Sequence, residues 1–187
     1  MSESPQQHYA KATTRQTGSS EAREQLVDWL RDAHAAEEQS EKMLTKFAGR
    51  IENYPELKSQ IQRHIEETRG QARRLKQCLD RYGDTTSTLK DAFGRMMAFA
   101  QGMSGAFVDD EIIKGSMAAY TFEHMEIASY RILIAAAESL GDTETRNICE
   151  QILEEEIAMA TWLEEHLPEI TQKYMLRTDM PGVTAKH

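Results

Sequence analysis

The 187-residue sequence has only two cysteines and four prolines, and it contains no long apolar run. Cys78 and Cys149 form no Cys-x-x-Cys motif and no Cys/His cluster, which excludes a disulfide scaffold and favours free thiols in a reducing compartment. No segment approaches the roughly 18 consecutive apolar residues of a membrane span, and the first 20 residues lack the apolar core of a secretion signal. The sequence therefore predicts a cytoplasmic protein that does not cross a membrane.

Positive charge is also scarce. The 22 Lys and Arg residues are outnumbered by 31 Asp and Glu residues, which gives a formal net charge of −9, and no segment gathers the basic residues into a stripe. Proteins that bind nucleic acids or anionic membranes carry such stripes. We therefore expect neither as a partner.

The residues that are abundant are helix formers, chiefly Ala, Glu, Gln, Leu, Met and Arg. Apolar residues recur every three or four positions in four long segments, which is the spacing of one helix face. These segments are residues 20–52, 55–82, 110–140 and 143–167. Four amphipathic helices in a chain of single-domain length predict an all-α four-helix bundle.

The connections between these segments indicate the topology. The breaks at residues 53–55 and 141–142 are short, whereas residues 83–109 form a long link with a short apolar helix at Leu89 to Ala100. Such a crossover is typical of ferritin-like bundles. We predict a disordered tail at 1–19, the bundle at 20–168 and an irregular tail at 169–187. The apolar 89–100 helix also predicts a homodimer.

Several carboxylates fall on the predicted inner faces. Glu37 and Glu123 lie at the centres of apolar stripes, Glu126 lies about 60° round the helix from Glu123, and other candidates lie at stripe edges. Because an unpaired buried carboxylate costs several kcal/mol, such a group needs compensation, which a pair of metal ions supplies in bundle di-metal proteins. The candidate ligands are Glu37, Glu67, Glu123, Glu126, Glu155, Glu156 and His64.

Other interpretations of these residues stay open. A Glu at a stripe edge commonly pairs with Lys or Arg, and Glu155 and Glu156 belong to a run of three acids that is typical of a solvated face. On the second helix, Glu66, Glu67 or His64 could contribute. Tyr130 either packs in the core or forms a hydrogen bond to a metal ligand.

Four strings of sequence resemble the YciE/YciF-type ferritin-like family, and the YciE kind more closely. They are DWLRDAHAAEEQSEKML, HIEETRGQ, EIIKGSMAAYTFEHMEIASY and ILEEEIAMATWL, within a likeness that covers residues 22–186. The resemblance implies a bacterial, stress-associated, usually dimeric bundle. It also implies a carboxylate-rich di-metal centre, by analogy with rubrerythrin and bacterioferritin.

Ferritin-type centres use Glu, then Glu-x-x-His, then Glu, then Glu-x-x-His, and this order matches Glu37, Glu123 and Glu156. The pair Glu123 and Glu126 is similar to the two-carboxylate helix of rubrerythrin. The sequence departs from the pattern because Glu66 is followed at the third position by Arg69, and Glu156 by Met159. His64 would be the nitrogen ligand of the second helix, or Arg69 would neutralise a carboxylate in place of a metal.

Two functional hypotheses follow. The first is a dinuclear iron or manganese centre, because an oxygen-rich donor set suits these metals. This centre would oxidise Fe(II) with a small-molecule oxidant, dioxygen or peroxide. That protein would be a di-iron oxidoreductase. The alternative is a metal-free helical stress-response dimer with a structural or interaction role. Metal content after purification without chelators separates the two.

Overall fold

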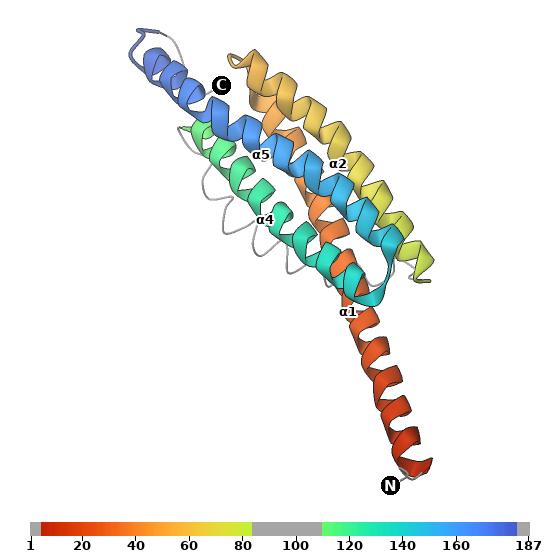
Figure 1. Ribbon diagram of the computed structural model, residues 1–187. Coiled ribbons are helices and arrows are strands. Elements are labelled where there is room, and N and C mark those ends of the chain that lie inside the picture. The colour runs from red at the N-terminus through yellow and green to blue at the C-terminus, as the bar shows by residue number, and fades with distance from the viewer. Residues whose placement is uncertain (1–4, 84–109, 183–187) are drawn as a thin grey trace.

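The computed structural model describes residues 5–83 and 110–182, with side chains from residue 20 onward. Its elements are four long helices that lie side by side, as Figure 1 shows: α1 (Pro5–Arg50), α2 (Pro55–Arg81), α4 (Glu111–Leu140) and α5 (Thr143–Thr178). Helix α1 packs against α2 and α4, and α5 packs against α4 and α2. The described residues contain no strand. The predicted all-α, ferritin-like four-helix bundle is confirmed.

Turn residues end and begin the helices where the sequence predicts. Pro55 opens α2 in its first turn, where its missing N–H has no helical partner to lose. Gly141 ends α4 with φ at 73°, a left-handed conformation that favours glycine. The next residue, Asp142, caps α5 by accepting a hydrogen bond from the backbone N–H of Thr145 at 3.0 Å.

The predicted end of the last helix at Pro168 is wrong. Helix α5 continues through this proline to Thr178, so residues 169–178 are not irregular. A proline inside a helix costs about 3 kcal/mol, and tertiary contacts offset this cost. Ile170 is buried in one core cluster with Tyr54 and Leu57, and Lys173 holds its ammonium 5.3 Å from the centroid of the Tyr54 ring.

Helix α1 begins at Pro5, within the segment for which the sequence predicts a disordered tail. Its first part projects beyond the other helices in Figure 1. Residues 1–19 lack apolar residues at three- and four-residue intervals, and this absence indicates that the segment does not pack against a core. It does not exclude a helix, because helix propensity is a local property. The predicted short helix at 89–100, and the dimer surface assigned to it, lie outside the described residues.

The core consists of two apolar clusters, one toward each end of the bundle. One contains Leu30 and Tyr130, and the other contains Leu44 and Leu163. Along α1, α4 and α5, the buried Glu37, Glu123, Glu126 and Glu156 occur between residues of the first cluster and residues of the second, whereas the buried Glu111 lies at the start of α4 and pairs with Arg50. The bundle thus contains a polar layer at mid-length, formed by Glu37, Glu123, Glu126 and Glu156, with an apolar cluster on each side along the bundle axis.

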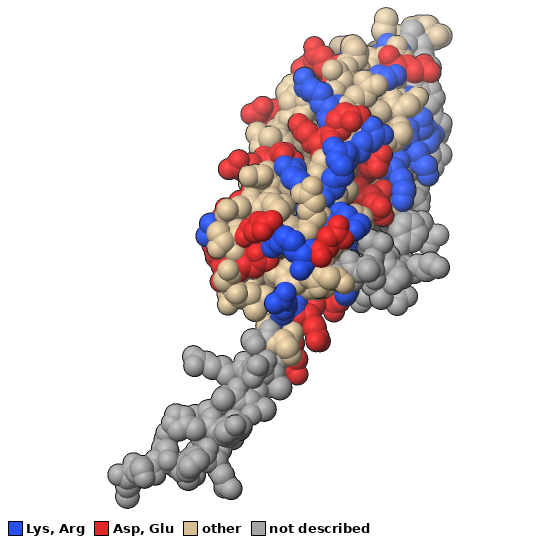
Figure 2. Space-filling model, turned by 90° about the vertical axis from the view of Figure 1, so that its right-hand side faces the viewer, with Lys and Arg blue, Asp and Glu red and all other residues tan. Residues whose placement is uncertain are grey.

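The surface carries both signs of charge. On the face that Figure 2 shows, acidic and basic side chains are intermixed along the described part of the bundle. In the described part of the chain, none of the helices has the length and apolarity that crossing a membrane requires.

Candidate metal centre

His64 on α2 lies at the centre of the polar layer. Its ring is fully buried, and its Nε2 atom lies 3.2 Å from Oε2 of Glu123 on α4 and 3.6 Å from Oε2 of Glu156 on α5. One ligand atom of each of the three residues lies within 4.8 Å of the other two. Three helices therefore deliver one imidazole and two carboxylates to a space of the size that a metal ion occupies.

Two further carboxylates complete the layer. Glu37 on α1 and Glu126 on α4 are 1% and 2% exposed. Oε1 of Glu37 accepts a hydrogen bond from the phenol of Tyr130, which joins α4 to α1. Although Glu123 and Glu156 lie within ion-pair distance of His64, six oxygens of the four carboxylates in this layer lack a hydrogen-bond partner among the described residues. Such atoms are costly to bury, so the layer fits a bound cation.

The pKa values respond to this crowding. Burial, opposed by the hydrogen bond from Tyr130, raises the pKa of Glu37 to about 8. Burial and the neighbouring carboxylates raise the pKa values of Glu126 and Glu156 well above the usual range. Burial alone would lower the pKa of His64, but the charge of Glu123 holds that pKa well above its usual value. Without metal, the layer therefore retains protons.

No Lys or Arg among the described residues forms an ion pair with these four carboxylates. Nε of Arg69 instead lies 2.7 Å from Oε1 of Glu41, and the same guanidinium also contacts Glu66. The alternative in which Arg69 neutralises an inner carboxylate is therefore wrong. The Arg69 side chain is 38% exposed and faces the outside of α2, away from the inner carboxylates.

Two of the predicted ligands lie at the rim of the layer. Glu67 is 47% exposed and accepts a hydrogen bond from Nδ1 of His64 at 3.0 Å. Glu155 forms an ion pair with Arg74, with 2.5 Å between Nη2 and Oε2, and its side chain is 30% exposed. In this structure, Glu67 therefore contacts a candidate ligand, and Glu155 is compensated by an arginine.

Gln71 has a role that sequence reasoning missed. Its amide nitrogen donates to Oε1 of Glu156 and, at 3.0 Å, to Oε2 of Glu155. The available signal was its position, four residues after Glu67 and seven after His64 on the same flank of α2. Gln71 therefore orients the carboxylate that α5 contributes.

Four long helices around a buried layer of four carboxylates and one imidazole define a ferritin-like bundle with a carboxylate-rich centre. Residues 21–176 match the family described as a domain of unknown function, DUF892. The chain belongs to this family, which is of the YciE/YciF type.

Relatives support this membership. Protein YciF of Escherichia coli strain K12 is 33% identical over 145 residues, which cover 71% of this chain and 82% of YciF. A crystal structure of a protein from Xanthomonas campestris pv. campestris has a TM-score of 0.72 and 42% identity, and covers 85% of this chain and 99% of its own. The crystal structure of the E. coli stress protein YciF has a TM-score of 0.66 and 26% identity, with coverages of 81% and 98%. YcfI from Rhodopseudomonas palustris has a TM-score of 0.66 and 32% identity, with coverages of 76% and 92%.

Proposed function

We propose that this protein binds a dinuclear iron or manganese centre in the polar layer and oxidises Fe(II) with dioxygen or peroxide during a bacterial stress response. The observation that carries the proposal is the set of six carboxylate oxygens in the polar layer that lack a hydrogen-bond partner among the described residues. Burying anions in this way is costly unless cations compensate them. The description of the E. coli relative as a stress protein supports the physiological part.

The donor set fits these metals. One imidazole and four carboxylates form a hard, oxygen-rich site that suits iron or manganese better than zinc or copper. His64, Glu123 and Glu156 would hold one ion, and Glu37 and Glu126 would provide ligands for the second ion. The hydrogen bond from Nδ1 of His64 to Glu67 leaves Nε2 free to face the ion, which is how bound histidines are generally oriented.

The chain's own residues prepare the site for redox chemistry. An Fe(II) ion held there would supply the electrons that reduce dioxygen or peroxide. The apolar clusters on both sides of the layer exclude bulk water. Tyr130 on α4 and Gln71 on α2 fix the carboxylates of Glu37 and Glu156 through hydrogen bonds. Since the inner acids hold protons when no metal is present, metal binding releases protons.

The decisive experiment compares metal content and thermal unfolding of protein purified without chelators. We expect bound iron or manganese, a loss of melting temperature on chelation, and sharply lower metal content in Glu37→Ala, Glu123→Ala and Glu126→Gln. Glu138→Gln is the matched control, because Glu138 lies on the exposed side of α4. A chelator-insensitive wild type and a Glu123→Gln variant that melts higher would contradict the proposal.

That second outcome would support the metal-free alternative, a stress-associated dimer with a structural or interaction role. The hydrogen bonds from Tyr130 to Glu37 and from Gln71 to Glu156 favour it, because they hold carboxylates without metal. In that case the layer would be stabilised by shared protons.

We also propose a cytoplasmic homodimer that buries the apolar residues of the 89–100 segment. The free, buried thiols of Cys78 and Cys149 support the cytoplasmic location. Light scattering at micromolar concentration should give twice the chain mass of 21.3 kDa. A mass near that of one chain would contradict the dimer.

A further inference from the structure

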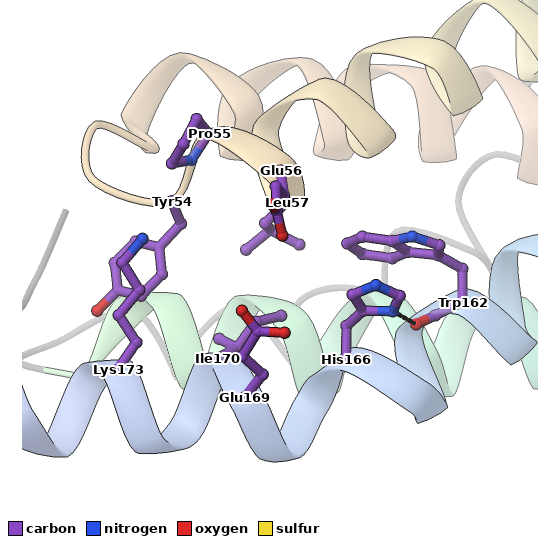
Figure 3. Close-up of a pocket in the computed structure, with 9 residues that line it drawn as sticks. All are labelled: Tyr54, Pro55, Glu56, Leu57, Trp162, His166, Glu169, Ile170 and Lys173. Atoms are coloured by element: carbon purple, nitrogen blue, oxygen red, sulfur yellow. Dashed lines mark hydrogen bonds between the residues drawn. The ribbon is translucent and has the colours of Figure 1, made fainter.

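A small pocket lies at one end of the bundle, between the start of α2 and the last part of α5 (Figure 3). Tyr54, Leu57, Trp162 and Ile170 form apolar walls, and its volume is about 100 Å³. Pockets for drug-sized ligands measure about 300 Å³ or more, so this pocket suits an ion with a few waters. It does not use any residue of the polar layer.

The ring of His166 is held in a defined orientation at this pocket. Nδ1 lies 2.7 Å from the backbone carbonyl oxygen of Trp162, and the imidazole stacks on the indole with ring centroids 4.0 Å apart and planes 15° apart. Because a carbonyl oxygen can only accept, Nδ1 carries the hydrogen. In the neutral ring, Nε2 therefore keeps its lone pair, and a backbone carbonyl on the other nitrogen is a common support for metal-binding histidines.

Two carboxylates line the same pocket. Glu169 follows His166 by three residues, so both lie on one face of α5, while Glu56 comes from the first turn of α2. Both side chains are exposed, and the ion pairs among described residues include neither. Figure 3 shows the Glu169 carboxylate extending into the space beside the His166 ring, below the start of α2. The one basic lining residue, Lys173, holds its ammonium over the Tyr54 ring.

We propose that this pocket binds a divalent transition-metal cation through Nε2 of His166 and the carboxylates of Glu169 and Glu56. One imidazole and two carboxylates form a donor set that such ions accept. His64, Glu123 and Glu156 already lie within 4.8 Å of one another, whereas Glu56 and Glu169 must rotate exposed side chains to reach a common ion. The pocket therefore binds its ion more weakly than the centre and exchanges it faster.

The two sites are separate along α5. His166 follows Glu156 by ten residues, which corresponds to about 15 Å along a helix axis. The pocket site therefore does not depend on the proposed centre, and an ion can occupy it when the centre is disabled. Trp162 stacks on the proposed ligand His166, which makes its fluorescence a direct reporter of the pocket.

The test is a fluorescence titration of the full chain with Co²⁺. The variant Trp29→Phe removes the other of the two tryptophans. We expect saturable quenching of Trp162 that EDTA reverses and that Mg²⁺ does not produce. Adding His166→Gln or Glu169→Gln should weaken the Co²⁺ affinity at least tenfold, and Glu123→Gln should leave it unchanged. His124→Gln is the matched control, since His124 is an exposed histidine that contacts the Tyr120 ring.

Three results would overturn the pocket site. They are the absence of saturable quenching in Trp29→Phe, an unchanged affinity in His166→Gln, and quenching that is lost in Glu123→Gln but kept in His166→Gln. The last result would assign the ion to the bundle centre. A failure of the proposed function leaves a different signature, because Co²⁺ would then quench Trp162 normally while the centre bound no metal. Glu56→Gln, which alters only an exposed side chain, provides a second variant if His166→Gln does not fold.

Discussion

Oε2 of Glu67 lies 3.0 Å from Nδ1 of His64, while the opposite ring nitrogen of His64 lies 3.2 Å from Oε2 of Glu123. The imidazole thus connects a half-exposed carboxylate to a buried one. Ferritin-type helices carry Glu three residues before His, and here the order is reversed. The reversed pair still delivers a nitrogen to the layer, and the glutamate becomes the group that orients it.

Replacing Glu67 tests this orienting role. Glu67→Gln should lower metal affinity about tenfold, because carboxylates that orient a bound histidine commonly contribute that much. Glu66→Gln is the control, since Glu66 is exposed and contacts Arg69 on the outside of α2. Titration of the metal-free protein with Mn²⁺ measures both. Equal losses in the two variants would contradict the assignment.

The metal-free protein should be less stable at high pH than at low pH. The pKa of Glu37 is about 8 in the folded chain, and those of Glu126, Glu156 and His64 are also raised. Groups with raised pKa values contribute stability that is complete below their unfolded values and is lost as the pH rises through the folded ones. The opposite contribution of Glu67, whose pKa is lowered, comes from a half-exposed group.

In the presence of a chelator, the melting temperature should therefore be higher at pH 5.5 than at pH 8. Saturating metal should weaken or reverse this dependence, because the metal competes with the same protons. Thermal unfolding at pH 5.5 and pH 8, with and without metal, measures this difference in melting temperature. A chelated protein that melts higher at pH 8 would show that the inner acids are not protonated.

Gly115 tests the close packing of α4 on α1. A Cβ atom at this position would lie 2.3 Å from Cε2 of Phe47, so Gly115→Ala should destabilise the fold by about 1–3 kcal/mol. In the control Gly70→Ala, the new Cβ would meet nothing closer than an arginine nitrogen at 3.8 Å, and stability should rise by about 0.5–1 kcal/mol. Denaturant unfolding that gave the same sign for both variants would be inconsistent with this packing.

Ile170 tests the continuation of α5 beyond Pro168. Because Ile170 is 6% exposed, Ile170→Ala should cost about 2–4 kcal/mol of unfolding free energy. Leu176→Ala removes a side chain that is 69% exposed on the same helix, so its effect should stay within about 0.5 kcal/mol. If residues after 168 were irregular, the two substitutions would have similar small effects.

The sequence by itself determined the helices and the faces that they bury. Apolar residues at three- and four-residue intervals report the angular position of each side chain, and this periodicity alone places Glu37, Glu123 and Glu126 on inner faces, where the folded chain buries them. Turn residues such as Pro55 and Gly141 determined where helices end, because their backbone preferences are local.

Tertiary structure decided which of these side chains meet. A helical angle does not specify which residue of another helix lies opposite, so it could not separate Glu156, which reaches His64, from Glu155, which pairs with Arg74. It also could not show that α5 passes through Pro168, because that outcome depends on the burial of Ile170 near Tyr54. Periodicity is a property of one segment, whereas partner choice depends on packing between segments that are distant in the chain.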